Sequence, residues 1–195
     1  MGAPLAILGP AITTRAATPG DARLLARLAD MAGEGLPSHI WAAEAGPGRT
    51  ALDMGIARAR RDRGAFSWWN ARVACWHGAA VGTIVDYDLD GIEDGPAPAL
   101  VAPLLELEAR ATGTRYVNIL AVLPEARRRR VARSLVTDAA RRTDRDLSLI
   151  VASGNRSARG FYVAHGFDEV ARHAMAPGGP EGLAGDWILM RRAAR

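Results

Sequence analysis

The first half of the chain alternates between apolar spacings typical of helices and of strands. Residues 12–33 predict a short strand and then a helix with an apolar leucine face. Glycines and prolines in residues 35–48 predict a broken connection before a second helix over residues 50–64. Residues 70–89 hold two strand-like runs around a tight turn at His77-Gly78, which predicts a β-hairpin.

The second half predicts three helices and four strands. The middle helix lies between two buried strands, which is the order of a β-α-β crossover with a parallel strand pair. The whole pattern therefore predicts an α/β protein with a mixed sheet. In chain order the elements are a helix at 100–112, a strand at 115–123, a helix at 129–142, a strand at 146–153, a short helix at 156–165 and strands at 167–175 and 185–192.

Length and composition suit one domain. The chain has 195 residues, of which 49% are hydrophobic and 24% charged, which is enough for a core without staples or metals. We expect an N-terminal tail over residues 1–11 and a single domain over residues 12–195. No apolar run approaches the roughly 20 residues of a membrane span, and the lone Cys75 excludes an internal disulfide. A cytoplasmic protein is therefore expected.

Four consecutive arginines, residues 127–130, stand directly before the helix-like run that starts at Val131. All 25 basic residues are arginine, so their placement is more informative than their number. A helix start is already positive because of its unpaired N–H groups, and each added cation there costs about 0.3–1 kcal/mol. The run therefore predicts an anionic ligand, and phosphate suits both N–H groups and guanidinium groups. A solvated arginine surface is the alternative.

Two motifs in the C-terminal third stand in a fixed order. The first is Q/R-x-x-G-x-G/A, matched by Arg127, Arg130 and Ala132, with arginine in place of the glycine. The second, N-x-x-A-x-x-x-Y-x-x-x-G-F, is matched in full by Asn155, Ala158, Tyr162, Gly166 and Phe167. With these motifs the chain resembles the GCN5-related N-acetyltransferases (GNAT family). The resemblance implies the GNAT fold, a twisted, mixed and mostly antiparallel sheet of six or seven strands flanked by helices.

The resemblance also implies an activity and a set of site residues. It implies transfer of an acetyl group from acetyl-CoA to a primary amine of a small molecule or peptide, by direct attack in a ternary complex. Asn155 either caps its helix or also contacts the pantetheine arm. Tyr162 protonates the departing CoA thiolate as general acid, or is a core tyrosine. The implied backbone contacts to pantetheine, at a bulged strand, are Leu120, Ala121 and Val122. The implied pyrophosphate site is Arg127, Arg128, Arg129, Arg130, Val131 and Ala132.

The general base is not evident from the motifs. Asn118 occupies the strand position where some relatives carry an acid. Our hypothesis is Glu106, on the helix before that strand. Ordinary surface carboxylates are the alternative for each candidate. The other candidates are Glu108 on the same helix and Asp86 and Asp88 on the hairpin.

We expect neither metal nor nucleic acid nor membrane among the partners. Residues 86–91 copy the first half of a calcium loop, D-x-D-x-D-G, but Ala97 stands where that loop requires glutamate. The four histidines show no ligand spacing. The arginines come without an aromatic base-stacking face. A homodimer is left open. The alternative function is a non-catalytic CoA-binding sensor or scaffold of the GNAT fold, because of Arg130 and the missing base.

Overall fold

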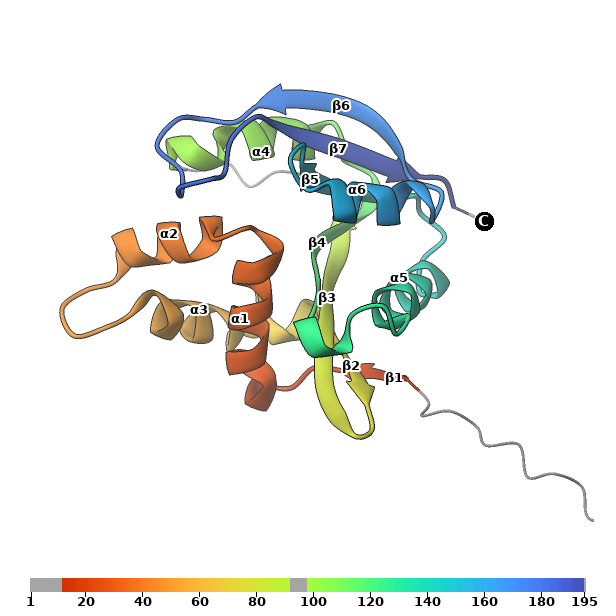
Figure 1. Cartoon of the computed structure of the whole chain (residues 1–195), viewed down its shortest axis with the longest axis horizontal. Coiled ribbons are helices and arrows are strands. Elements are labelled where there is room, and N and C mark those ends of the chain that lie inside the picture. The colour runs from red at the N-terminus through yellow and green to blue at the C-terminus, as the bar shows by residue number, and fades with distance from the viewer. Residues whose placement is uncertain (1–11, 92–97, 195) are drawn as a thin grey trace, which may run out of the picture.

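The computed structural model describes residues 12–91 and 98–194, so the predicted tail over residues 1–11 and Ala97 lie outside the described part. Within it the chain forms one seven-stranded sheet with helices on both faces (Figure 1). The strands are β1 (Thr13–Ala16), β2 (Ala71–Trp76), β3 (Ala79–Leu89), β4 (Thr114–Val122), β5 (Leu147–Ala152), β6 (Asp168–Ala174) and β7 (Asp186–Arg192). The α-helices are α1 (Ala22–Ala32), α2 (Leu36–Glu44), α3 (Ala51–Ala59), α4 (Ala102–Ala109), α5 (Val131–Arg141) and α6 (Arg156–Val163).

The sheet is mixed and mostly antiparallel, as predicted. Its strand order is β1-β2-β3-β4-β5-β7-β6, and only the β4–β5 pair is parallel. The crossover through α5 accounts for that pair. The predicted hairpin between β2 and β3 is confirmed, and His77 and Gly78 both have positive φ, 51° and 79°. That is the backbone of a tight hairpin turn.

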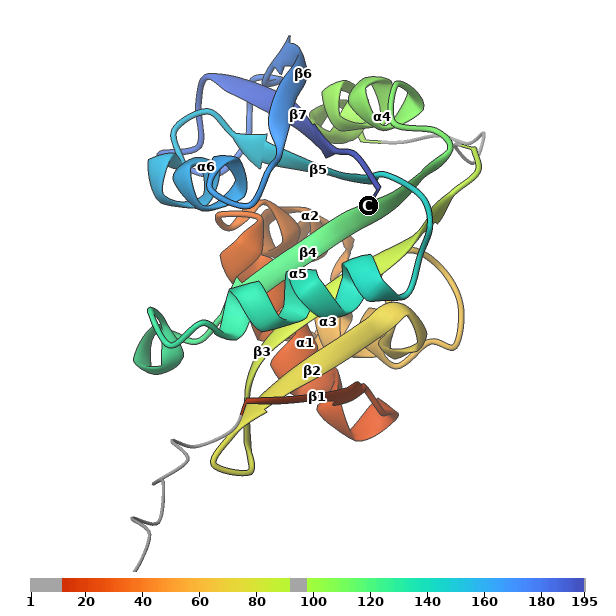
Figure 2. The same cartoon turned by 90° about the vertical axis from the view of Figure 1, so that its right-hand side faces the viewer.

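The helices divide between the two faces of the sheet. In Figure 2, α5 lies in front of β2, β3 and β4, and α1 and α3 lie behind them. Side chains of β4 alternate accordingly. Val117 and Leu120 pack into the core cluster with α5 and α6, whereas Tyr116 and Ile119 pack into the clusters on the opposite face. Neighbouring residues of β4 therefore reach both sides of the sheet.

The parallel strands β4 and β5 stay together over only a short distance. Their register covers three pairs, from Arg115↔Leu147 to Val117↔Leu149, although both strands continue further. The β3–β4 register shifts at the same level, because Val85 pairs with Ile119 and Asp86 with Val117. Asn118 is thus an extra residue, a β-bulge that bends β4. We call the separation of β4 from β5 beyond Val117 the strand opening.

The prediction of a broken connection over residues 35–48 is wrong, because Leu36–Glu44 form helix α2. Glycine and proline lie at its start, where they favour a helix rather than break it. Gly35 has φ 87° and precedes the helix, and Pro37 lies in the first turn. The Asp30 carboxylate, at the end of α1, accepts the backbone N–H of Ser38 at 2.9 Å. The helix is therefore capped by a side chain from the preceding helix, a signal that its own residues do not carry.

Helix α3 is shorter than predicted. It begins, as expected, after Thr50, whose side chain accepts the Asp53 N–H in a capping box. It ends at Ala59, which is fully buried, whereas residues 60–65 are all exposed. Beyond Ala59 the helix would have no core to pack against.

Candidate active site

The four arginines at 127–130, here called the arginine loop, lie between β4 and α5, and all four are exposed. Within residues 12–91 and 98–194, no carboxylate forms an ion pair with any of them. The first turn of α5 has no side-chain cap either. The uncompensated guanidinium charge of the arginine loop therefore lies beside the positive end of the helix dipole, at the start of α5.

Two residues of the arginine loop have left-handed backbone. Arg128 has φ 60°, and Arg130, the N-cap of α5, has φ 66°. Glycine adopts this conformation freely, whereas other L-residues lose about 1–2 kcal/mol there. The position where the pyrophosphate motif has glycine is thus one whose backbone conformation favours glycine. Arg130 keeps its N–H group but carries the strain.

Comparing Arg130→Gly with Arg130→Ala tests this strain. Both variants lose the same charge, so they differ only in backbone freedom. We expect the glycine variant to have a free energy of unfolding about 1 kcal/mol larger than the alanine variant. Urea unfolding of the two proteins measures the difference. Equal stabilities, or a more stable alanine variant, would show that the helix start relaxes out of the left-handed region.

Two further contacts orient the arginine loop. The guanidinium carbon of Arg129 lies 4.2 Å from the ring centroid of Trp76, a cation–π contact. Arg127 Nε donates to the Val122 carbonyl oxygen at 3.3 Å. Trp76 belongs to the β2–β3 hairpin, so the hairpin supports the loop. Sequence reasoning did not find Trp76, because no local pattern indicates which loop meets the hairpin end.

The predicted pantetheine residues lie on β4 beside the strand opening. Leu120, Ala121 and Val122 pair on one side with Ile84, Thr83 and Gly82 of β3. On the β5 side their level lies beyond the last parallel pair. β4 is a bulged strand, as the resemblance implies, and its bulge lies at Asn118. The bulge redirects β4 just before the segment that borders the opening.

Tyr162 reaches the same region from α6. It is 8% exposed and packs with Val117 in the core cluster on the α5 face. Its ring lies 5.6 Å from the ring of Phe167, edge to face. Burial raises the pKa of the Tyr162 hydroxyl, so the group stays protonated across the neutral range. The hydroxyl can therefore donate a proton but not act as an anion.

Asn155 caps α6, which is one of its two predicted roles. Its Oδ1 accepts the Ala158 N–H at 3.0 Å. Its amide nitrogen donates to Glu34 Oε1 at 2.7 Å, in the connection between α1 and α2. The bond joins α6 to the helices on the opposite face, beside the end of β5. The motif predicts the cap, but nothing in the sequence indicates that Glu34 accepts a hydrogen bond from the Asn155 amide.

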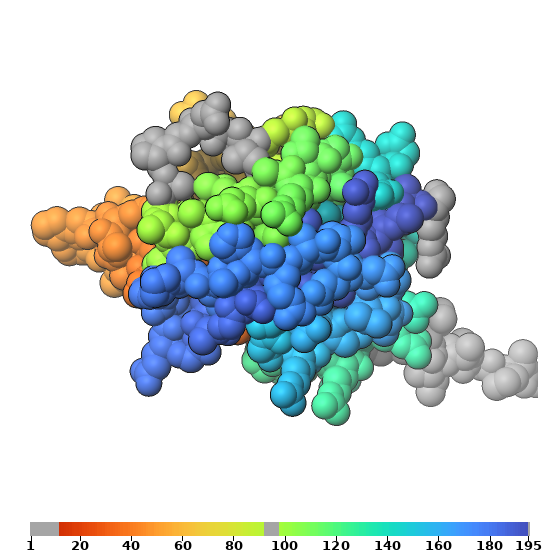
Figure 3. All heavy atoms as spheres, turned by 90° about the horizontal axis from the view of Figure 1, so that it is seen from above, coloured from red at the N-terminus to blue at the C-terminus, as the bar shows by residue number. Residues whose placement is uncertain are grey.

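The four candidate bases lie in different surroundings. Glu106 has a side chain that is 62% exposed and pairs with His173 on β6 at 3.1 Å. Figure 3 shows α4, in green, beside the strands at the blue end of the chain. Asp88 is 43% exposed and pairs with Arg115. Glu106 thus contacts the edge of the sheet rather than the strand opening.

Asp86 is fully buried between two arginines. Its carboxylate accepts Arg115 Nε at 2.7 Å and Arg142 Nη2 at 2.8 Å, which joins β3, β4 and α5. Arg142 also pairs with Asp138, at 3.0 Å. Both carboxylate oxygens of Asp86 are occupied, so it is a structural ion pair rather than a proton acceptor.

Asp86→Asn should lower the free energy of unfolding by about 3 kcal/mol, because two guanidinium groups lose their buried anion. Asp88→Asn is the matched control, since Asp88 shares Arg115 but is exposed, and it should cost less than about 1 kcal/mol. Urea unfolding measures both. Similar costs for the two substitutions would contradict the structural role of Asp86.

Glu108 is the remaining candidate, and it lies on the buried side of α4. Burial raises its pKa above the ordinary value for glutamate, and a hydrogen bond from the Tyr116 hydroxyl opposes this rise. Tyr116 is 3% exposed, and the Tyr87 ring lies 5.8 Å from its ring. Burial, then the charge of Glu108, raises the pKa of Tyr116, and Tyr162 adds a smaller contribution. Glu108 and Tyr116 are thus bonded to each other on the α4 face, at a level where β4 is still paired with β5, because Tyr116 pairs with Ser148.

The described residues give two further findings on ligands and membranes. In residues 12–91 and 98–194, no group of three or more His, Cys, Asp or Glu side chains is arranged to hold a metal ion. Over the same residues, none of the helices combines the length and apolar character that crossing a membrane requires.

Solved structures share this fold with acetyltransferases. A structure described as an acetyltransferase superposes with a TM-score of 0.64 at 16% identity, covering 94% of this chain and 100% of the other. An N-acetyltransferase from Staphylococcus aureus Mu50 gives 0.66 at 16% identity, covering 92% and 99%. Arabidopsis thaliana Naa50, in complex with the bisubstrate analogue CoA-Ac-MVNAL, gives 0.54 at 16% identity, covering 93% and 98%. The fold is thus that of the acetyltransferases.

The sequence comparison identifies the family. The profile of the Acetyltransferase (GNAT) family matches residues 36–167, which is more than half of the chain. The protein therefore belongs to the GNAT acetyltransferase family. No curated protein matches the sequence significantly.

Proposed function

We propose that the protein is an N-acetyltransferase that moves an acetyl group from acetyl-CoA to a primary amine of a small molecule or peptide. The observation that carries the proposal is the strand opening. It begins beyond Val117, which packs with Tyr162 on the α5 face, and it lies next to the last paired residues of β4, where Tyr116 bonds Glu108 on the other face. Two substrates can then meet through the sheet from opposite faces. The single cysteine suits a reducing cytoplasm, which is the location we propose.

On the α5 face, the proposal assigns the CoA contacts. The arginine loop and the N–H groups of Val131 and Ala132 would bind the pyrophosphate. Backbone groups of Leu120, Ala121 and Val122 would hold the pantetheine arm and polarise the thioester carbonyl. Asn155 would act through its helix cap, since its side chain is already bonded at both ends.

On the α4 face, the proposal assigns the base to Glu108 rather than to Glu106. The amine nitrogen attacks the thioester carbonyl carbon, and the carbon–sulfur bond breaks. The proton lost by the nitrogen passes to the Glu108 carboxylate, and the Tyr162 hydroxyl protonates the thiolate. The products are the acetylated amine and free CoA. A carboxylate with a raised pKa is the better proton acceptor near neutral pH, and Glu108 has one.

Calorimetry with acetyl-CoA, followed by a thiol-release assay over a panel of primary amines, tests this function. We expect saturable binding of acetyl-CoA and amine-dependent release of free thiol. Replacing all four arginines of the arginine loop with glutamine should weaken binding strongly. Arginines that form ion pairs elsewhere would be a poor control, because their replacement would also break those ion pairs. The control is therefore glutamine at Arg60 and Arg63, which are exposed and follow α3. Absence of acetyl-CoA binding would refute the proposal.

A non-catalytic CoA-binding sensor is the second candidate. The observation that favours it is the left-handed Arg130 at the motif glycine, since a side chain there restricts the approach of a phosphate to the backbone. Binding without turnover for every amine in the panel would favour the sensor. Turnover with any of these amines would exclude it.

A further inference from the structure

Asn155, Ala158 and Tyr162 lie along one stripe of α6, because steps of three and four residues return to the same face of a helix. Asn155 accepts the Ala158 N–H at 3.0 Å, and Ala158 packs against the core cluster that holds Tyr162. The cap and the proposed general acid are thus at the two ends of one helix of eight residues. A helix this short has little stability of its own, so the contacts at its cap also hold Tyr162 in place.

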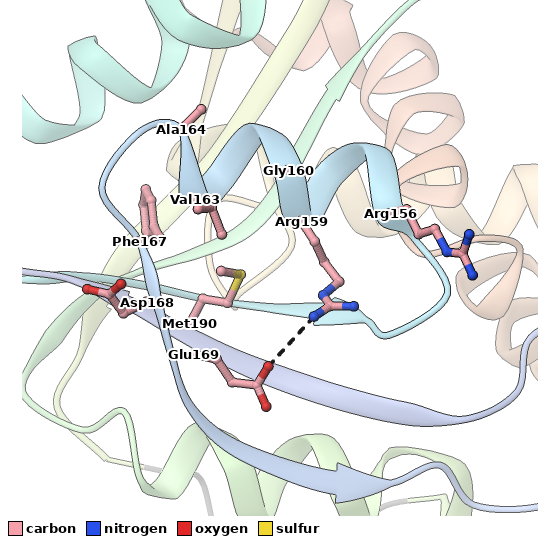
Figure 4. A pocket seen from close by; sticks show the side chains of 9 residues that line it. All are labelled: Arg156, Arg159, Gly160, Val163, Ala164, Phe167, Asp168, Glu169 and Met190. Carbon is pink, nitrogen blue, oxygen red and sulfur yellow. Dashed lines mark ion pairs between the residues drawn. The ribbon is translucent and has the colours of Figure 1, made fainter.

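The opposite stripe of α6 receives weaker support. Arg156, Arg159 and Val163 face a groove of about 480 Å³ between α6 and the strands β6 and β7 (Figure 4). Across this groove Arg159 Nη2 and Glu169 Oε2 lie 3.8 Å apart, a long ion pair between partly exposed side chains that contributes little to stability. The groove leaves room for α6 to shift, so its position depends on its cap.

Glu34 supplies a contact to this cap from the other face of the sheet. Its Oε1 accepts a hydrogen bond from the Asn155 amide nitrogen at 2.7 Å. Glu34 lies just before α2, and α2 packs through Leu36 into the cluster that contains Tyr116. Helix α6 packs into the cluster on the α5 face instead. The bond therefore joins elements from the two faces of the sheet, beyond the end of β5 and on the side where β4 has separated from it.

The Glu34 carboxylate also determines which way the Asn155 amide points. A carboxylate only accepts hydrogen bonds, so the amide nitrogen turns towards Glu34 and the amide oxygen is left for the Ala158 N–H. Glu34 has left-handed backbone at φ 53°, a conformation that costs a residue with a side chain about 1–2 kcal/mol. Such a conformation persists where the surrounding structure holds the residue in place.

We propose that Glu34 is a positioning residue for the reaction: through its bond to Asn155 it sets the place of α6, and thereby that of the Tyr162 hydroxyl. The inference rests on the proposed role of Tyr162 as general acid. A misplacement of about 1 Å at a reacting group can lower a rate by about 10²-fold. Loss of the bond should therefore lower kcat, whereas the arginine loop, which belongs to other elements, should keep its affinity for acetyl-CoA.

Reversing the direction of the bond tests the proposal. Asn155→Asp keeps a good helix cap, because Asp and Asn cap about equally well, but it places a second carboxylate against Glu34. It should lower kcat by about tenfold or more and change the Kd for acetyl-CoA by less than about twofold. Glu34→Gln alone should remain near wild type, because its amide oxygen still accepts the bond.

The double variant, Glu34→Gln with Asn155→Asp, should recover kcat. The new amide nitrogen at position 34 then donates to the new carboxylate at position 155, so the bond forms again with its direction reversed. A misfolded single variant would not be repaired by a second substitution. If Asn155 instead acts by contacting the cofactor directly, Asn155→Asp should raise the Kd for acetyl-CoA and the double variant should stay impaired, which would contradict the proposal.

Fluorine NMR follows Tyr162 independently of turnover. The chain has three tyrosines, so protein made with fluorotyrosine should give three signals, and Tyr162→Phe identifies one of them. That signal should shift in Asn155→Asp and return in the double variant. Glu181→Gln is the matched control and should leave it in place. It removes an exposed carboxylate next to Pro180, which approaches Gly35, but it leaves the bond to Asn155 intact.

Two outcomes would overturn the role of Glu34. One is a Tyr162 signal that Asn155→Asp leaves unshifted, and the other is a double variant that stays as impaired as Asn155→Asp. A wild-type chain without turnover for any amine would count against the proposed function, and the fluorine signals would still decide whether Glu34 holds Tyr162 in place.

Discussion

Replacing Tyr162 with phenylalanine should lower kcat by about 10²–10⁴-fold, the usual contribution of a general acid. The Kd for acetyl-CoA should change little, because the ring and its packing against Phe167 remain. The physical reason is the buried hydroxyl, which is protonated at neutral pH and is the group that the proposal assigns to protonate the CoA thiolate. A steady-state assay of thiol release measures kcat, and calorimetry measures the Kd for acetyl-CoA.

Tyr87→Phe is the matched control for this substitution. Tyr87 lies on β3 and contacts the ring of Tyr116, but the proposed reaction gives it no proton to transfer. It should keep most of the wild-type turnover. If Tyr162→Phe turns over as fast as wild type, Tyr162 is a core tyrosine and the acid lies elsewhere.

Replacing Glu108 with glutamine should lower kcat/KM by about 10²–10⁴-fold and change the pH profile. The wild-type rate depends on the carboxylate form, so it should fall as the pH drops through the pKa of Glu108. Burial places that pKa above the ordinary 4.5, so the fall should begin above the range of an exposed glutamate. The glutamine variant has no group that titrates there and should lack this limb.

Glu106→Gln is the control on the same helix. Its side chain is exposed and bonded to His173, so the substitution should leave the acid limb of the profile in place. If instead Glu106→Gln removes the limb and Glu108→Gln does not, the original hypothesis of Glu106 as base holds and the present assignment is wrong.

Much of the fold follows from local patterns. The hairpin at His77-Gly78, the crossover through α5 and the cap at Asn155 each depend on residues close together in the chain. Helix α2 was missed because its cap, Asp30, belongs to another helix. The length of α3 depends on where its core contact ends, at Ala59, which is a tertiary property.

The site residues that belong to a motif could be predicted from the sequence. The general base could not, because packing between separate elements decides its surroundings. Glu106 and Glu108 are two residues apart, so they face different sides of α4. The stripe Leu104, Leu107, Glu108 and Ala111 is the buried one, and a glutamate within an apolar stripe was a signal present in the sequence. The sequence carried no signal that Tyr116 is the partner of Glu108, because the contact joins two elements whose relative position the sequence does not give. The left-handed backbone of Arg130 likewise appears only in three dimensions.

The arginine loop has one more consequence. Lysine ε-amino groups accept acetyl from acetyl donors and lose their charge, whereas guanidinium groups stay protonated and do not react in this way. The sequence contains 25 arginines among its 25 basic residues, so it has no lysine at all. The cations around α5 therefore cannot be neutralised by the very thioester they are proposed to hold, and their charge is independent of how much acetyl donor surrounds the protein.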